Sequence, residues 1–208
     1  LIVTSDHGES LGEHNFYFDH CDVYEPTVHV PLIIRYPGEV PKGKRIKCLI
    51  QSTLSIAPTI LDVFGIEVPR EMEGKNLVDI SRGEIEGYKE IYVNQGLWTA
   101  KRALRIGDWK LIKTLDRSFW DTPEIELYNL EEDPNEERNL APEKPELVDK
   151  LELKMYRWLK SKLKKRRDPL ELITREGLPV YRYVRRAAEE AGLLELYEEW
   201  RMKVDRAE

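Results

Sequence analysis

The residue types that can do chemistry gather near the start of the chain, where all 4 histidines lie within the first 29 residues. Asp6 and His7 directly follow an apolar segment, residues 1–4, and precede Gly8. A carboxylate oxygen and an imidazole nitrogen are both competent ligands for divalent metal ions, and glycine permits a sharp turn that presents adjacent side chains to one centre. The pair predicts a metal site; for the tripeptide alone, the alternative is an Asx-type turn with a solvent-facing histidine.

Strands are needed to hold this pair in place. Residues 1–4 are apolar on both faces, which is typical of a central parallel strand. In open α/β sheets, ligands lie beyond the carboxyl ends of the strands, where Asp6 and His7 would emerge. We expect a second strand at residues 29–36, in which Pro31 favours an edge strand or a strand start.

A helix is expected after the second strand, over residues 55–64. Ser55 is its candidate cap, Pro58 is tolerated in a first turn, and Gly65 can end it. Residues 67–88 show no clear periodicity and are expected to form an irregular connection.

The composition then shifts towards a small antiparallel sheet. A turn at Gly107-Asp108 predicts a hairpin, and a long helix with one apolar face is expected over residues 142–165. A last helical segment is expected over residues 180–202. The predicted strands are residues 90–94, 102–106, 109–113 and 126–129.

Composition sets broad limits on function. The net charge of -6 argues against a general nucleic-acid binder, which would show a basic footprint. No apolar run approaches the ~20 residues that span a bilayer, so we expect no membrane span. The 2 cysteines are too few for a disulfide framework or a cysteine zinc site. The sequence does not indicate a compartment.

A series of short motifs resembles the sulfatase family of the alkaline phosphatase superfamily. Each motif is modest, but they follow one another in the family's order over roughly residues 1–165. The motifs are Ser5-Asp6-His7-Gly8, Leu11-Gly12-Glu13-His14, Tyr24-Glu25, Val30-Pro31-Leu32-Ile33, Ala57-Pro58-Thr59, Gly74-Lys75-Asn76-Leu77, Arg105-Ile106-Gly107-Asp108 and Asp133-Pro134-Asn135. The resemblance implies an α/β fold: an alkaline-phosphatase-like mixed sheet with flanking helices, plus a small antiparallel C-terminal subdomain with a packed helix.

The resemblance also implies the chemistry of sulfate-ester hydrolysis at a metal site. Asp6 and His7 correspond to two ligands of one divalent metal ion, which would orient the sulfate and polarise its oxygens. Calcium is common in the family, and manganese or zinc in close relatives. Because calcium prefers oxygen ligands, His7 leaves the choice between calcium and manganese or zinc open. The expected substrate is a sulfate ester of a small molecule or a glycan.

Two further histidines become candidates through the resemblance. His20, in Phe18-Asp19-His20, occupies the loop in which many sulfatases carry a sulfate-contacting lysine. As a catalytic residue it would contact a sulfate oxygen or protonate the leaving alkoxide; the alternative is a loop histidine bonded to Asp19. His14 is a candidate substrate-binding residue, with a structural role in the loop as the alternative. His29, Glu13 and Glu25 are expected to be structural.

The family's nucleophile motif is absent from this chain. In sulfatases a cysteine within Cys-x-Pro-Ser/Ala-Arg is converted to formylglycine, and neither Cys21 nor Cys48 has that context. We therefore expect this chain to be the C-terminal part of a sulfatase, with formylglycine only in the N-terminal part, and to be inactive by itself.

The sequence leaves two alternative functions open. A phosphonate monoester or phosphodiester hydrolase of the same superfamily remains open, as does an inactive binding or assembly module. We divide the chain into residues 1–88 of the catalytic domain, 89–166 of the small subdomain and a helical tail, 167–208. Uncovered apolar edges predict poor solubility or a homo-oligomer for the isolated chain.

Overall fold

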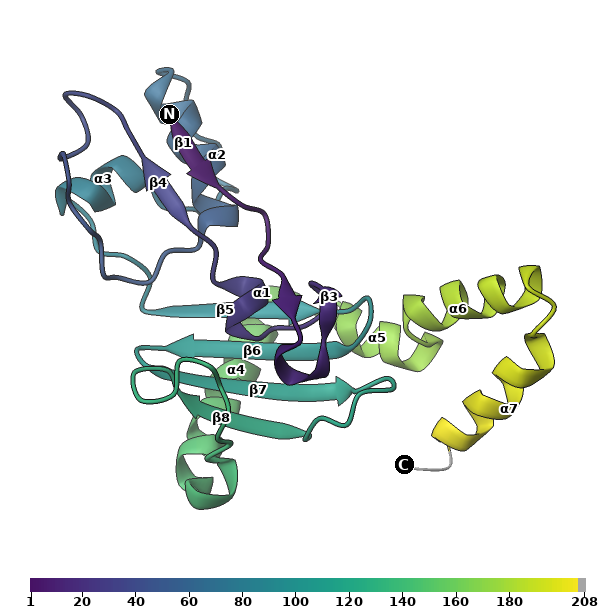
Figure 1. Ribbon diagram of the computed structural model, residues 1–208. Coiled ribbons are helices and arrows are strands. Elements are labelled where there is room, and N and C mark those ends of the chain that lie inside the picture. The colour runs from purple at the N-terminus through teal and green to yellow at the C-terminus, as the bar shows by residue number, and fades with distance from the viewer. Residues whose placement is uncertain (206–208) are drawn as a thin grey trace.

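The computed structural model describes residues 1–205, and its first part carries a two-stranded sheet (Figure 1). β1 (Ile2–Thr4) pairs antiparallel with β4 (Leu32–Ile34), and Val3 lies opposite Ile33. This corrects the expected parallel strand at residues 1–4, because an apolar pattern on both faces does not encode strand direction. Pro31 precedes β4, in agreement with a strand start.

The segment between these strands is more ordered than the loop we expected. It contains β2 (Ser10–Leu11), a short 3₁₀ turn, η1 (Glu13–Asn15), β3 (Tyr17–Asp19) and α1 (Glu25–Val28). β2 and β3 pair antiparallel as a small hairpin, which carries the residues around His20 back towards the end of β1.

Helix α2 (Ser52–Val63) begins three residues before the expected start. Ser55 is therefore not a cap: it is buried, and its hydroxyl lies 2.8 Å from the hydroxyl of Tyr88. Pro58 lies inside the helix rather than in its first turn.

A second helix, α3 (Leu77–Arg82), replaces part of the expected irregular connection. The side chain of Asn76 accepts the backbone N–H of Val78 at 2.8 Å and caps its start. Gly83 ends it in the left-handed conformation, with φ of 84°. Both signals are local, but the helix is too short for a clear apolar period.

The four-stranded antiparallel sheet matches the expected strands closely (Figure 1). Its strands follow one another in chain order, so each pairs with its sequence neighbour. Gly107, with φ of 56°, makes the tight turn between the second and third strands. The strands are β5 (Glu90–Gln95), β6 (Ala100–Ile106), β7 (Trp109–Asp116) and β8 (Ile125–Asn129).

The two faces of this sheet differ in character. On one face Leu104, Leu111 and Leu127 lie side by side, fully buried against α4 (Pro145–Leu163). Truncating one such leucine to alanine costs about 2–5 kcal/mol in comparable cores. Because side chains alternate along a strand, the neighbouring positions face the N-terminal segment. That second face is buried yet carries ionisable groups, namely Lys101, Lys110 and Glu126.

The long helix α4 is preceded by a 3₁₀ turn, η2 (Ala141–Glu143).

The C-terminal tail consists of three helices rather than the single expected segment. The tail helices are α5 (Pro169–Glu176), α6 (Pro179–Glu190) and α7 (Leu194–Asp205). Breaks fall at Gly177 and Gly192, both with positive φ.

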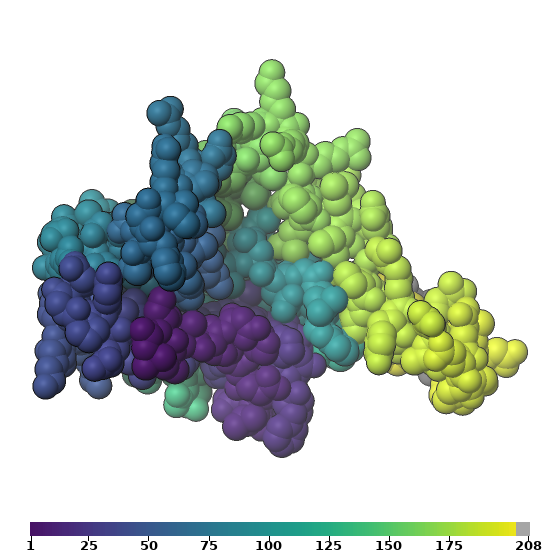
Figure 2. All heavy atoms as spheres, turned by 90° about the horizontal axis from the view of Figure 1, so that it is seen from above, coloured from purple at the N-terminus to yellow at the C-terminus, as the bar shows by residue number. Residues whose placement is uncertain are grey.

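The tail helices meet the sheet at one buried cluster. Leu170 of α5, Leu178, and Val180 and Tyr181 of α6 are buried beside Ala100, and Trp200 of α7 packs against them. The rest of α6 and the start of α7 extend away from the body (Figures 1 and 2). Among residues 1–205, no helix combines the length and apolar character needed to cross a lipid bilayer. The division of the chain at residues 88 and 166 stays a prediction.

Candidate active site

The carboxyl end of β1 presents Asp6 and His7 as the sequence predicts. Asp6 Oδ1 accepts the backbone N–H of His7 at 3.0 Å and lies 3.8 Å from His7 Nε2. The other ring nitrogen, Nδ1, lies 2.8 Å from the carbonyl oxygen of Gly8. When Nδ1 donates its proton to this carbonyl oxygen, Nε2 carries a free lone pair that can bind a metal ion.

Gly8 is required by close packing rather than by a left-handed turn. A Cβ atom at this position would lie 2.0 Å from the carbonyl oxygen of Pro26 in α1. The backbone N–H of Gly8 donates to the carbonyl of Thr27 at 2.7 Å. The glycine thus lets the chain after β1 run directly against α1, which holds the Asp6–His7 pair in place.

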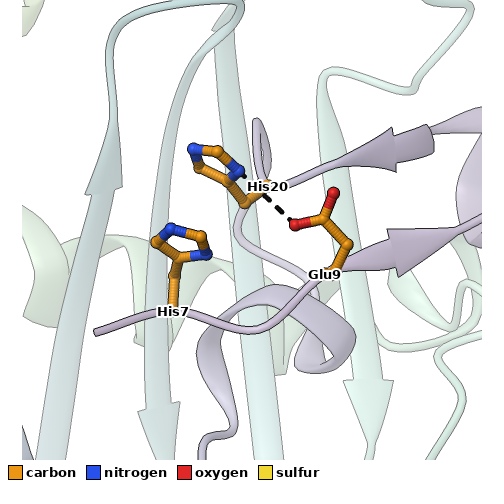
Figure 3. A group of neighbouring side chains, drawn as sticks. All are labelled: His7, Glu9 and His20. Carbon is orange, nitrogen blue, oxygen red and sulfur yellow. Dashed lines mark ion pairs between the residues drawn. The ribbon is translucent and has the colours of Figure 1, made fainter. Parts of the chain in front are cut away.

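His20 lies against His7 (Figure 3). The two imidazole rings are stacked, with centroids 3.8 Å apart and an angle of 15° between their planes. Glu9 completes the group: its Oε2 lies 3.6 Å from His20 Nδ1, and one ligand atom from each of the three residues lies within 4.8 Å of the others. The structure therefore brings His7, Glu9 and His20 together.

The sequence pattern held a signal for Glu9. Glu9 lies two positions after His7, and side chains two positions apart in an extended segment share a face. Our sequence reasoning used Glu9 only as part of a motif and missed its place beside the histidines.

Both alternatives considered for His20 are compatible with its surroundings. Its Nδ1 lies 3.7 Å from Asp19 Oδ1, and its backbone N–H donates to the same carboxylate at 2.7 Å. Its side chain is nevertheless 49% exposed. Asp19 thus orients the residue while the ring stays accessible.

The other two histidines have structural contacts. The His14 ring stacks on Tyr24, with centroids 3.7 Å apart, and its Nε2 lies 3.1 Å from the carbonyl oxygen of Asn135. Burial lowers the pKa of His14, which favours its neutral form. His29 caps the end of α1 and pairs with Glu25 at 3.1 Å. Substrate binding by His14 stays a prediction.

Glu25 connects α1 to the four-stranded sheet. Its carboxylate accepts hydrogen bonds from Lys110 Nζ at 2.9 Å and Arg105 Nη1 at 3.0 Å. Burial acts to raise its pKa, but the bond to His29 and the charges of Lys110 and Arg105 outweigh it and lower the pKa to about 2. Pairing of Glu25 agrees with the structural role we expected.

The two cysteines differ in their surroundings. Both are free thiols. Burial, reinforced by the charges of Asp19 and Asp22, raises the pKa of Cys21 to about 12, so it remains a thiol at neutral pH. Cys48 is exposed, and its sequence context gives it no catalytic partner. Both fit the ordinary thiols expected.

A hollow opens beside the histidines. It has a volume of about 1250 Å³ and is bordered at one end by Asp6, His7 and His20 and by residues 91–95 of β5. Its other wall follows β4 and residues 43–53. The site residues therefore face open space, not the protein core.

The donor set fits a divalent metal ion. Ligand atoms of one ion lie ~2.0–2.6 Å from it, so two of them can be separated by the 3.8 Å between Asp6 Oδ1 and His7 Nε2. His7, Glu9 and His20 offer a second, overlapping set. A nitrogen and carboxylate mixture suits zinc or manganese better than calcium.

The fold places the chain among proteins with the alkaline-phosphatase-like fold. A solved structure of a putative sulfatase from Bacteroides thetaiotaomicron matches it with a TM-score of 0.67 and 25% identity, over 77% of this chain and 36% of that chain. The chain belongs to the sulfatase family: residues 12–166 match the family described as N-sulphoglucosamine sulphohydrolase, C-terminal. This confirms the resemblance and the fold class stated from the sequence.

Two further relatives carry descriptions of their substrates. The N-acetylglucosamine-6-O-sulfatase of Bacteroides thetaiotaomicron is 33% identical over 168 residues, which are 73% of this chain and 29% of that protein. A solved structure described as a complex with its substrate D-glucosamine-2-N,6-O-disulfate is 30% identical, with a TM-score of 0.63, over 78% of this chain and 33% of that chain. The chain thus spans less than a third of the curated relative's length.

Proposed function

We propose that the protein containing this chain hydrolyses a sulfate group on a glucosamine unit of a glycan or of a smaller saccharide. The family description and both substrate descriptions name sulfated or N-acetylated glucosamine. The observation that carries the proposal is the stacked His7–His20 pair, placed at the end of β1 beside an open hollow. In this proposal the chain contributes part of the site, and the formylglycine nucleophile comes from another part of the complete protein.

Asp6 and His7 hold the metal ion in this proposal. Their oxygen and nitrogen are adjacent, and the tautomer in which Nδ1 donates to the Gly8 carbonyl leaves the Nε2 lone pair able to bind a metal ion. A divalent ion bound there supplies Lewis-acid polarisation of the sulfate oxygens. The two residues themselves fix where the sulfate group lies relative to His20.

His20 acts on the substrate from the other side of the stack. Its accessible ring donates a hydrogen bond to a sulfate oxygen or gives a proton to the leaving alkoxide. The backbone bond to Asp19 and the proximity of Glu9 orient the ring for either role.

Sulfate release by the complete protein tests the proposal. N-acetylglucosamine-6-sulfate and glucosamine-2-N,6-O-disulfate should release sulfate, while a phosphonate monoester and a phosphodiester of similar size should react at least about 10²-fold more slowly in kcat/KM. Faster turnover of the phosphorus esters would assign the protein to phosphonate or phosphodiester hydrolysis instead. No turnover of either class, with metal supplied, would support the inactive binding module.

A further inference from the structure

The segment that carries His20 is tied to the sheet by a fully buried ion pair. Lys101 of β6 and Asp22, two residues after His20, have side chains that are 0% exposed, and Lys101 Nζ lies 2.9 Å from Asp22 Oδ2. The other carboxylate oxygen of Asp22 accepts the backbone N–H of Val23 at 2.6 Å. The Asp22 carboxylate thus holds the backbone at Val23 and also ties the segment after His20 to Lys101 of the sheet.

The amino group of Lys101 contacts both the N-terminal segment, residues 16–24, and the sheet. Lys101 Nζ donates to the hydroxyl of Tyr24 at 3.4 Å and lies 4.7 Å from the centre of that ring. It also lies 5.7 Å from the ring centre of Phe16 and 3.9 Å from Glu126 Oε2. Burial raises the pKa of Asp22, and the charge of Lys101 opposes that rise.

Stability alone does not account for such a pair. Buried ion pairs cost more to desolvate than their attraction returns in many proteins, and apolar residues of similar volume often replace them without loss of stability. What a buried pair does provide is a single allowed arrangement, since any other leaves a charge unpaired. Here the arrangement that it selects is the position of residues 20–22 on β6.

We propose that Lys101 and Asp22 form a positioning pair that holds His20 against His7. The catalytic consequence rests on the proposed function, whereas the structural consequence does not. The carbonyl of His20 accepts a long bond of 3.5 Å from Gln95 Nε2, and the carbonyl of Cys21 one of 3.4 Å from Thr99 Oγ1. These contacts are long, so among the described residues the Lys101–Asp22 pair is the short polar connection between residues 20–22 and the sheet.

The test compares three changes in the complete protein: Lys101→Met, Asp22→Leu and the double variant. Each single variant leaves one buried charge unpaired and should lower the melting temperature. The double variant removes both charges of the pair, and Glu126 keeps the hydroxyls of Tyr24 and Tyr128 as hydrogen-bond donors. Its melting temperature should therefore return towards that of the wild type. Its kcat should nevertheless stay about 10²-fold low, because small displacements of a group at the reacting centre have effects of that size, while KM changes less.

A matched control uses the neighbouring residue of β6, whose side chain points to the other face of the sheet. Arg102 Nη2 contacts both oxygens of Asp168, at 3.0 and 2.9 Å, with side chains 8% and 9% exposed. The double variant Arg102→Met with Asp168→Leu removes another ion pair of low exposure, one that is directed at α5. Its kcat should stay within about threefold of the wild type.

Amide hydrogen exchange provides a readout that does not depend on activity. Residues 17–22 should exchange about tenfold faster in the Lys101→Met/Asp22→Leu variant, with β7 unchanged. Recovery of kcat and of protection together with the melting temperature would overturn the inference, as would an equal loss in the Arg102/Asp168 control. If the wild type shows no sulfatase activity, the proposed function fails, and the exchange measurement still decides this inference.

Discussion

His7 and His20 are in direct ring-to-ring contact, 3.8 Å between centroids, although they come from different segments of the chain. His7 follows β1, while His20 follows the small β2–β3 hairpin. The contact places the candidate metal ligand, His7, next to the candidate catalytic residue, His20. Changes at either residue therefore need readouts that separate metal binding from turnover.

Replacing His20 with asparagine should lower kcat of the complete protein by about 10²–10⁴-fold, the range over which a positioned proton donor acts. Metal affinity should change much less, because Asp6 and His7 remain. His29→Asn is the control, since its side chain is 72% exposed and pairs with Glu25. Equal kinetics of the two variants would remove His20 from the catalytic group.

Metal binding should discriminate between the two overlapping donor sets. If Asp6 and His7 are the ligands, Asp6→Asn weakens manganese or zinc binding by about tenfold or more, and Glu9→Gln has little effect. The opposite order would assign the ion to His7, Glu9 and His20. Isothermal titration calorimetry of the complete protein measures both. Glu13→Gln is the control, because the Glu13 carboxylate accepts the N–H of Leu11 and belongs to neither donor set.

The depressed pKa of Glu25 makes the chain sensitive to acid. Its pKa falls from 4.5 unfolded to about 2 folded, so its contribution is complete above pH ~4.5 and is lost as the pH falls towards 2. That contribution is about 3 kcal/mol. Chemical denaturation from pH 5 to 2 should show a smaller loss of unfolding free energy in Glu25→Gln than in the wild type. Parallel pH profiles would contradict this assignment.

The β1–β4 sheet should promote association of the 208-residue chain. Val3 and Ile33 lie opposite each other and are 47% and 61% exposed, and such apolar strands favour pairing with further chains. The double variant Val3→Lys with Ile33→Lys should shift the chain towards monomer in size-exclusion chromatography with light scattering. Leu153→Lys on α4, at a position 48% exposed, should not. A monomeric wild type would refute this prediction.

The sheet strands and α4 could be predicted from sequence because their signals are local. Alternation of side chains, the Gly107 turn and one apolar stripe define them without reference to distant residues. The direction of β1 could not be predicted, because its pairing depends on β4, about thirty residues away. The break at Gly192 falls inside the helix expected over residues 180–202, because the apolar positions on which that helix was predicted lie on both sides of the glycine.

The site was predictable to the extent that its residues are adjacent in sequence. Asp6 and His7 follow directly from their place after a strand. The stack of His20 on His7 depends on the β2–β3 hairpin, and the burial of Lys101 depends on Asp22, far from it in sequence. A lysine in a strand normally indicates a solvent-exposed face, so sequence alone gives no reason to bury it.

The contrast between the two faces of the sheet also limits how the strands can pair. A slip of β6 by one residue would turn its side chains over, which would move Lys101 away from Asp22 to the face that packs on α4 and α5, and Leu104 to the ionic face. A buried charge without a partner costs several kcal/mol, so the slipped pairing is strongly disfavoured. The ionic face thus favours one strand register during folding. In that register Lys101 meets Asp22, and the His20 segment lies on β6.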